Sequence, residues 1–311
     1  MIDPCPPSDL CNAQCDLDHT AYFLPTIDHA GAALTQLGFT LTPFTSQLHR
    51  IEPGAPLTPA GTGNCCIMLQ RGYLELLTPT HDTPNAAQLR AAIARYTGMH
   101  LIAFGTQTPE ADHQRLAAGG FAPLTPVALQ RQVGTQTGET TARFTVVRVP
   151  PLAMAEGRIQ FCQHHTRDAV WQPRWLTHPN HATGLAGVVL CVADPTEAAK
   201  RYARFTGLPA KKMHQTGNVW RLDAARGYLL FVSPAVLQQS LGLTAPALPW
   251  IAGCVIDSDD MNATWALVKG ERLGERTLVK LDAALGGMMI FQATGSAPLN
   301  FNGSVTATNP L

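Results

Sequence analysis

A short phrase of this sequence occurs twice, once in each half of the chain. Residues 71–77 read Arg-Gly-Tyr-Leu-Glu-Leu-Leu, and residues 226–232 read Arg-Gly-Tyr-Leu-Leu-Phe-Val. Each copy follows a Thr-Gly-Asn at nearly the same spacing, at 62–64 and at 216–218. Such internal repetition indicates that one structural unit is used more than once, and this limits the folds that the chain can adopt.

The two copies differ at one position that bears on function. The first copy carries Glu75 within its apolar run, where the second carries Leu230. Burying a carboxylate costs free energy unless another group pairs with it. We therefore expect the functional site to include Glu75.

Composition excludes several classes of partner. The chain has 311 residues, enough for two domains with sizeable cores. Its formal net charge is +0 and it has no Lys/Arg run, which argues against nucleic acid or an anionic membrane as partner. No stretch approaches the ~20 apolar residues that a membrane span needs. The N-terminal residues lack the features of a secretory signal, so we predict a cytoplasmic protein with reduced cysteines.

Turn residues divide the chain into four predicted βαβββ units. The first has strands at 17–24, 39–45, 65–69 and 73–77 and a helix at 27–37; the second has strands at 99–105, 127–133, 144–149 and 158–164 and a helix at 109–118. The third has strands at 185–192, 219–222 and 228–232 with a helix from 194 to 206, and the fourth has strands at 251–256, 277–281 and 288–291 with a helix starting near 259. Proline at a helix start and glycine after its end support these helices.

Four such units predict an α+β fold with mixed sheets, in which paired units form two cupped domains. A cup of this kind is a natural place for a ligand. We expect a disordered leader at 1–15, an N-terminal domain at 16–172, a connector at 173–184, a C-terminal domain at 185–297 and a tail at 298–311.

Several motifs in this order resemble the vicinal oxygen chelate superfamily, and more narrowly its glyoxalase-like domain proteins, which include metal-free bleomycin-resistance proteins and extradiol dioxygenases. The motifs are Leu17-Asp18-His19, Gly63-Asn64, Gly72-Tyr73-Leu74-Glu75-Leu76-Leu77, and the segment from Gln160 through His164 to Trp171. The resemblance implies a divalent metal in the cup, which takes two oxygens of a substrate. It implies an architecture more firmly than a reaction.

His19 and Glu75 are the first two metal ligands that the resemblance implies, and they suit Fe, Mn, Co, Ni or Zn. A hydrogen-bonded His–Glu pair without metal is the alternative. For the third ligand we favour His164. Gln160 aligns with Glu75 and is the next choice, but it lies four residues before His164, about 13 Å along an extended strand. His100 is a third choice, which needs a one-residue shift because Leu101 aligns with His19.

Asn64, Gln160 and Trp171 are expected to contact the substrate. The second cup is a contrast, since Val188, Leu230, Cys254 and Met289 stand near the corresponding positions and cannot hold a metal.

Two functions follow as hypotheses. The first is a metal-dependent enzyme, a dioxygenase or a lyase or isomerase, that acts on a small molecule with adjacent oxygens. The second is a metal-free protein of the bleomycin-resistance type that sequesters a small molecule. A homodimer is left open by the sequence.

Overall fold

The computed structural model describes residues 15–49, 56–213 and 217–301, and the predicted α+β fold of four βαβββ units is confirmed in them. Most of the predicted leader and tail, and the first residue of the second Thr-Gly-Asn, lie outside these ranges. Among the described residues, no helix combines the length and the apolar character that crossing a bilayer takes.

The first two units form the N-terminal half. Unit one consists of β1 (Asp16–Phe23), α1 (Asp28–Gln36), β2 (Thr45–His49), β3 (Thr58–Met68) and β4 (Tyr73–Pro79). Unit two consists of β5 (Gly98–Gly105), α3 (Pro109–Ala118), β6 (Val127–Thr135), β7 (Gly138–Arg148) and β8 (Arg158–His164). The predicted strand at 39–45 is displaced to β2, because the backbone near Thr40 and Thr42 bonds to His178 and Cys66 before the strand begins.

The last two units form the C-terminal half. Unit three consists of β9 (Ala182–Cys191), α5 (Pro195–Thr206), β10 (Ala210–Lys212), β11 (Trp220–Asp223) and β12 (Tyr228–Val232). Unit four consists of β13 (Trp250–Ser258), α7 (Met261–Val268), β14 (Glu271–Leu273), β15 (Arg276–Lys280) and β16 (Met288–Ala293). A short helix α4 (Arg167–Val170) and a 3-10 turn η2 (Pro173–Trp175) precede β9.

One helix joins the two units of each half: α2 (Pro84–Arg95) and α6 (Pro234–Leu241). Both begin with a side-chain cap followed by proline at the first helical position, Thr83 before Pro84 and Ser233 before Pro234. This is the usual start signal of a helix. The sequence therefore held evidence for two helices that the predicted layout omitted.

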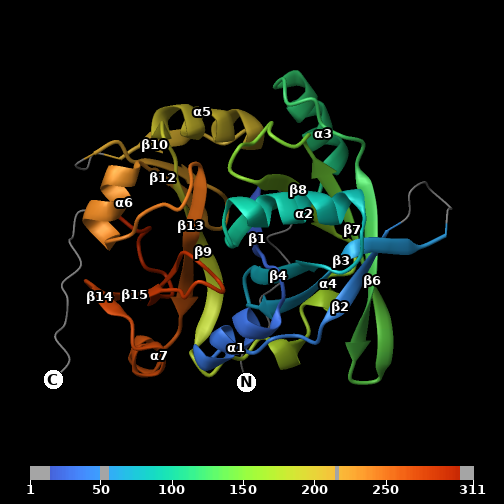
Figure 1. The fold of residues 1–311 in the computed structure, drawn as a ribbon, viewed down its shortest axis with the longest axis horizontal. Coiled ribbons are helices and arrows are strands. Elements are labelled where there is room, and N and C mark those ends of the chain that lie inside the picture. Colours follow the sequence, from blue (N-terminus) through green and yellow to red (C-terminus); the bar gives the residue numbers. More distant parts are fainter. Residues whose placement is uncertain (1–14, 50–55, 214–216, 302–311) are drawn as a thin grey trace.

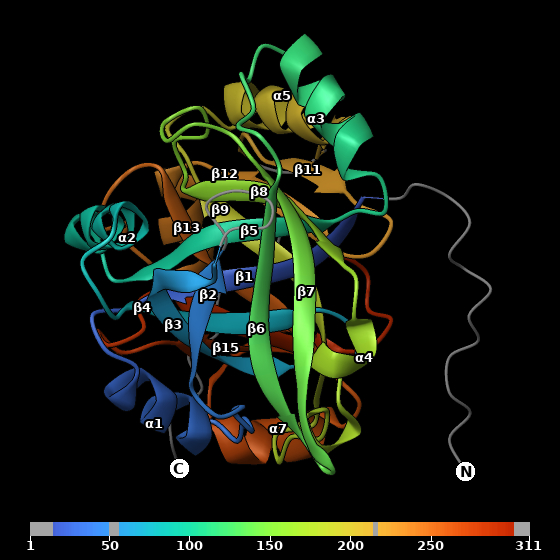
Figure 2. The ribbon, with the colours of Figure 1, turned by 90° about the vertical axis from the view of Figure 1, so that its right-hand side faces the viewer.

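The strands of the N-terminal half close into a ring of eight, in the order β1-β4-β3-β2-β6-β7-β8-β5. β5 pairs antiparallel with β1 and so returns to the start. On the far side, Leu48 of β2 pairs with Gln130 of β6. Figure 2 shows β6 and β7 as long strands across the front of this barrel, with α2 at one side of it. The closed ring encloses the space in which the site is found.

The strands of the C-terminal half remain an open sheet, in the order β10-β11-β12-β9-β13-β16-β15-β14. In Figure 1 this half lies on the left and the N-terminal barrel on the right. β13 pairs with β9 along its length and touches β5 at one register position, Ile251 with Met99. The strands of the two halves thus belong to one continuous sheet.

The repeated Arg-Gly-Tyr turns connect the two halves. Arg71 exchanges backbone hydrogen bonds with Thr183 and Leu185, at the start of β9, while the amide of Leu17 in β1 donates to the carbonyl of Arg226. Gly72 and Gly227 both have a positive φ, of 80° and 84°. A Cβ at either one would lie 2.8 Å from the opening strand β1. Both copies of the repeated phrase therefore need glycine at this position, because of its backbone conformation and its close packing against β1.

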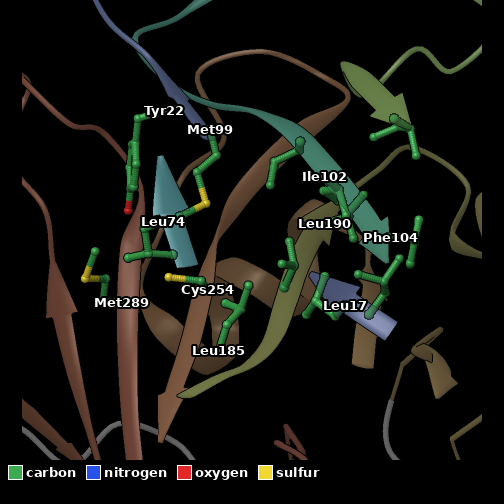
Figure 3. Close-up of a cluster of buried hydrophobic side chains, with 14 of the residues drawn as sticks. Leu17, Tyr22, Leu74, Met99, Ile102, Phe104, Leu185, Leu190, Cys254 and Met289 are labelled. Atoms are coloured by element: carbon green, nitrogen blue, oxygen red, sulfur yellow. The ribbon is translucent and has the colours of Figure 1, made fainter. Parts of the chain in front are cut away.

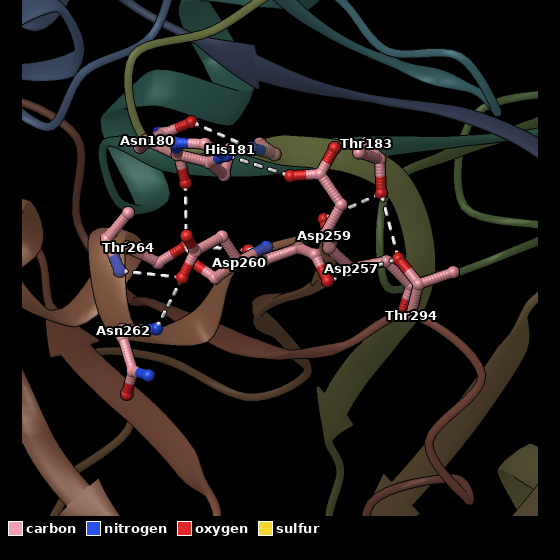
Figure 4. Close-up of polar contacts among 12 residues, drawn as sticks. Asn180, His181, Thr183, Asp257, Asp259, Asp260, Asn262, Thr264 and Thr294 are labelled. Atoms are coloured by element: carbon pink, nitrogen blue, oxygen red, sulfur yellow. Dashed lines mark hydrogen bonds and ion pairs between the residues drawn. The ribbon is translucent and has the colours of Figure 1, made fainter. Parts of the chain in front are cut away.

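Apolar side chains from both halves share one core. It includes Leu17 and Tyr22 of β1, Phe104 of β5, Leu190 of β9 and Met289 of β16, all buried (Figure 3). A polar cluster joins the start of β9 to the residues around the end of β13 and the start of α7 (Figure 4). Its contacts include those of His181 with Asp259, Thr183 with Thr294, and Thr264 with the carbonyl of Asn180.

The cup of the C-terminal half is filled with apolar side chains, but of the four residues that the sequence placed there only Leu230 lies in it; Val188, Cys254 and Met289 belong to the core between the halves. His19 pairs with Tyr73 in the first half, and Gly187 pairs with Tyr228 in the second. The position equivalent to His19 is therefore Gly187, and Val188 packs into the core between the halves. The cluster inside the cup contains Val189, Leu230, Val255 and Ile290 from strands, and Val236, Leu237 and Leu241 from α6.

Candidate functional site

The N-terminal barrel contains a cavity of about 660 Å³. Because side chains alternate along a strand, every second residue of β1, β4 and β8 faces the inside. These residues are His19 and Phe23; Tyr73, Glu75 and Leu77; and Arg158, Gln160 and Cys162. A cavity of this size accommodates a molecule of metabolite or drug size.

His19 presents one ring nitrogen to the cavity. Its Nδ1 donates to Oδ2 of Asp18 at 2.7 Å, and its ring stacks on Tyr73 with centroids 4.3 Å apart. This fixes both the tautomer and the ring orientation, so the lone pair of Nε2 is the one available to a ligand. Carboxylates orient metal-binding and catalytic histidines in the same way.

His164 lies on the other side of Asp18. Its Nε2 donates to the same Oδ2 at 2.9 Å, and Sγ of Cys162 lies 3.8 Å away. Burial alone would raise the pKa of Asp18, but His164 and His19 outweigh it and hold that pKa well below its usual range. Burial alone would lower the pKa of His164, yet the Asp18 carboxylate raises it to about 10. The Asp18 carboxylate thus favours the charged form of His164, whose Nδ1 is buried without a hydrogen-bond partner among the described residues.

The rings of Tyr73, Phe144 and Trp171 surround His164, each with its edge or face at a steep angle to the imidazole. His164 is not among the residues that line the cavity. The structure therefore brings His164 to His19 through Asp18, and places it behind the cavity wall.

Glu75 lies in the cavity wall with one carboxylate oxygen occupied. Its Oε1 accepts hydrogen bonds from the side-chain amides of Gln47, at 3.1 Å, and Asn64. The Oδ1 of Asn64 in turn accepts from Arg131 at 2.9 Å. Among the described residues Oε2 has no hydrogen-bond partner. Asn64 thus links Glu75 to Arg131 and holds the Glu75 carboxylate at the cavity wall.

The other predicted ligands take different places. Gln160 lines the cavity, and its Oε1 accepts from Nε of Arg148 at 3.2 Å. His100 is fully buried between Tyr96 and Phe23, with Nε2 2.8 Å from the Tyr96 carbonyl oxygen. Burial lowers the pKa of His100 to about 4. The pairing of β1 with β5 does shift by one residue beside His100.

Trp171 does not line the cavity. Its Nε1 donates to the carbonyl of Leu69 at 3.0 Å, and its ring packs against Tyr73 and His164. It supports the aromatic enclosure of His164 instead of facing the interior.

Two sets of side chains have the chemistry to hold a divalent metal. The first is His19 Nε2 with Glu75 Oε2, which are both available at the cavity wall. The second is Asp18, Cys162 and His164, whose donor atoms lie within 4.8 Å of one another. Imidazole, carboxylate and thiolate are all suitable ligands for first-row transition metals. In the second set, a metal has to displace the proton that His164 shares with Asp18.

Sequence reasoning missed two groups, Asp18 and the arginines. Strand alternation places Asp18 opposite to His19, but a register shift between Leu17 and His19 lets the two side chains meet. In the sequence, Asp18 was indicated only as a charged residue next to a predicted ligand, His19, within an apolar strand. Arg131, Arg148 and Arg158 are spread over three strands, and only the closed barrel brings them to one cavity.

A family model described as "Glyoxalase-like domain" matches residues 17–206. A hypothetical protein from Staphylococcus aureus has a similar crystal structure, with a TM-score of 0.61 at 11% identity over 90% of this chain and 99% of that one. A xylose isomerase-like TIM barrel/4-hydroxyphenylpyruvate dioxygenase fusion protein matches with a TM-score of 0.57 at 12% identity, over 95% of this chain and 52% of that one. No curated protein matches this sequence.

A further similar structure is a mutant of 4-hydroxymandelate synthase from Streptomyces coelicolor. Its TM-score is 0.48 at 13% identity, over 92% of this chain and 95% of that chain.

Proposed function

This chain belongs to the glyoxalase-like domain family of the vicinal oxygen chelate superfamily, and on that premise we propose that its N-terminal barrel is a metal-dependent enzyme site. The substrate is a small molecule with adjacent oxygen atoms. The metal is a divalent cation such as Fe, Mn, Co, Ni or Zn, and His19 and Glu75 are the side chains that hold it. The proposal covers dioxygenase chemistry and lyase or isomerase chemistry alike.

The observation that carries the proposal is a pair of atoms at the cavity wall, Nε2 of His19 and Oε2 of Glu75, that have no hydrogen-bond partner among the described residues. His19 has Nδ1 fixed by Asp18 and Glu75 has Oε1 fixed by Asn64 and Gln47. Each therefore has one oriented donor left for a ligand. Two side chains held in place in this way lose little conformational entropy when they bind a cation.

A bound divalent cation supplies Lewis-acid stabilisation of negative charge that develops on a substrate oxygen. The chain's own residues supply the rest. Asp18 keeps the His19 ring in one tautomer, Tyr73 supports its face, and the apolar residues Phe23, Leu77 and Leu101 keep water away from the substrate. A water-poor cavity strengthens each electrostatic contact inside it.

Elemental analysis of the protein after reconstitution with each of the five metals tests this proposal. We expect about one divalent ion per chain, and His19→Ala or Glu75→Gln should weaken metal binding by at least tenfold. His29→Ala, at an exposed histidine of α1, is the control and should bind as the wild type does. A wild-type protein that takes up no divalent metal rejects the proposal.

Cys162→Ser separates the two sets of ligands. If the metal lies between His19 and Glu75, this variant keeps the wild-type metal affinity. If the affinity falls with Cys162→Ser and is unchanged by Glu75→Gln, the metal lies at Asp18, Cys162 and His164 instead.

Metal-free binding of a small molecule is the second candidate function. It is favoured by the state of β5 and β8, where Leu101 offers no ligand atom and the side-chain oxygen of Gln160 is bonded to Arg148. In this case His19 and Glu75 act as hydrogen-bonding groups. Ligand affinity that is unchanged by a chelator supports this function, and affinity that disappears with the chelator rejects it.

A further inference from the structure

The charges around the cavity are strongly unequal, although the chain as a whole is balanced at 22 Lys+Arg and 22 Asp+Glu. Glu75 is the only carboxylate among the described residues that line the cavity. Four arginines line it as well: Arg95, Arg131, Arg148 and Arg158.

Two of these arginines are already accounted for by the protein. Arg131 is linked to Glu75 through hydrogen bonds to Asn64, so the charge of Arg131 is balanced by that of Glu75. Arg95 is exposed and donates to the carbonyls of Ala155 and Pro249. Arg148 and Arg158 are left as the cations of the wall that have no carboxylate partner among the described residues, although the guanidinium of Arg158 lies over the ring of Phe23, 5.4 Å from its centroid.

Arg148 and Arg158 lie close together at one end of the barrel, where β7 ends and β8 begins. Arg148 donates from Nε to Gln160, at 3.2 Å, and Arg158 donates to Oδ1 of Asn85, at 2.9 Å. A guanidinium has five N–H donors, so most donors of both side chains have no partner among the described residues. Neither arginine forms an ion pair with a carboxylate in that part of the chain.

This arrangement costs free energy in the absence of a ligand. Burial and the neighbouring charge of Arg148 together outweigh Glu75 and lower the pKa of Arg158 to about 9. Burial also lowers the pKa of Arg148. Two partly buried cations that repel each other and face a cavity are stabilised when an anion enters between them.

We propose that Arg148 and Arg158 form an anion subsite that binds the carboxylate of a small organic acid with a mainly apolar body inside the N-terminal barrel. A carboxylate matches the planar fork of guanidinium donors. The rest of the molecule contacts the apolar wall, which includes Phe23, Leu77, Leu129, Phe144 and Val146. The inference rests on the proposed function in taking the cavity as the binding site, and it names the class of substrate.

The position of the subsite fits such a molecule. Leu101 pairs with Arg158 and lies opposite Ala21, two residues along β1 from His19. That step along a strand is about 7 Å, and the two strand spacings from β1 through β5 to β8 add about 10 Å across the sheet, so the backbones of His19 and Arg158 are roughly 12 Å apart. One end of a small organic acid can therefore contact the arginines while its other oxygens face His19 and Glu75.

Calorimetric titration with matched pairs of acids and alcohols tests the subsite. The probes are benzoate, 3-phenylpropionate and 4-phenylbutyrate, each beside the primary alcohol with the same body, and EDTA is present throughout. We expect at least one acid to bind the wild type at least tenfold more tightly than its alcohol. Arg148→Gln/Arg158→Gln should remove this preference, and Arg158→Lys should retain part of it.

Arg143→Gln is the matched control, because Arg143 lies on β7, is exposed and does not line the cavity. This variant should keep the preference, and circular dichroism checks that each variant is folded. Equal affinity for acids and alcohols in the wild type overturns the proposal. A preference that survives in the double variant, or a series in which no acid binds, also overturns it.

The EDTA condition separates this result from the proposed function. If the protein binds no metal but prefers the acids, the metal proposal fails and the anion subsite stands. If the double variant still binds metal as the wild type does and the wild type has no preference for acids, only the subsite fails.

Discussion

The two halves of this protein have the same order of elements, but one half encloses a cavity and the other is filled with apolar side chains. The N-terminal strands close into a barrel around a cavity with Glu75 in its wall, whereas the C-terminal strands form an open sheet with Leu230 at the equivalent place. The connecting helices differ in the same sense. α2 lines the cavity with Asn85, Gln88, Ala91 and Ala92, while α6 inserts Val236, Leu237 and Leu241 into its own cup.

The difference shows that one copy of a repeated unit can stabilise the fold while the other copy encloses a cavity. The C-terminal half buries apolar surface, which stabilises the fold, and supports β1 and β5 from behind through the shared core. The N-terminal half leaves polar and charged groups around a cavity, which lowers stability unless a ligand compensates. Four predictions test this division of roles.

The largest effect on stability is expected for an ion pair through which the C-terminal half holds a loop at the edge of the cavity. Arg201 of α5 forms a two-pronged ion pair with Glu156, which is 0% exposed and lies within the loop that lines the cavity. Arg201→Met leaves a buried carboxylate without its partner and should lower the free energy of unfolding by about 4 kcal/mol, measured by urea denaturation. Glu197→Gln removes the exposed partner of Arg201 and should cost less than about 1 kcal/mol. Equal losses contradict this anchoring.

Two leucine-to-alanine changes compare the filled cup with the open cavity. Leu237 of α6 is 0% exposed inside the C-terminal cup, and Leu237→Ala should cost about 3 kcal/mol because it leaves a void. Leu152 lines the N-terminal cavity and is 89% exposed, so Leu152→Ala should cost less than about 0.5 kcal/mol. Urea denaturation of both variants checks the comparison, and a small loss for Leu237→Ala shows that the second cup is not tightly packed.

Acid sensitivity should come from the N-terminal half. His100 has a pKa of about 4 in the folded protein and about 6.5 when unfolded, so the unfolded chain takes up the proton first. Its contribution to stability therefore falls as the pH drops from 6.5 towards 4, by about 2 kcal/mol between pH 7 and pH 5. His100→Asn should remove that part of the pH dependence. His29→Asn, at an exposed site, should retain it, and parallel pH profiles for all three proteins refute the prediction.

The smallest effect on stability should come from filling the N-terminal cavity. Ala92→Leu adds an apolar side chain from α2 at the cavity lining, and the free energy of unfolding should change by less than about 1 kcal/mol. Binding of the preferred acid should weaken at least tenfold, because the added side chain occupies its space. Ala87→Leu, at an exposed position of α2 away from the cavity, should leave both unchanged. A loss of several kcal/mol for Ala92→Leu means that the wall is packed and has no room.

The site could be predicted from the sequence only in part. Alternation along β4 and β8 is local, so the shared faces of Glu75 with Tyr73 and of Gln160 with Cys162 follow from residue spacing. The assignment of His19 and Glu75 as metal ligands stays a prediction. The neighbours of Asp18 depended on a bulge in the pairing of β1 with β5, and a bulge leaves no reliable trace in one strand.

The sequence by itself determined the repeating unit, most of its helices and strands, and the chemical contrast between Glu75 and Leu230. These depend on local signals, such as proline and glycine at helix ends and the period of two in strands. Only the tertiary structure decided that one half closes into a barrel and that Arg148 and Arg158 face the same cavity as His19. Closure depends on strand pairs between residues far apart in the chain, and their free energy comes from packing the whole domain.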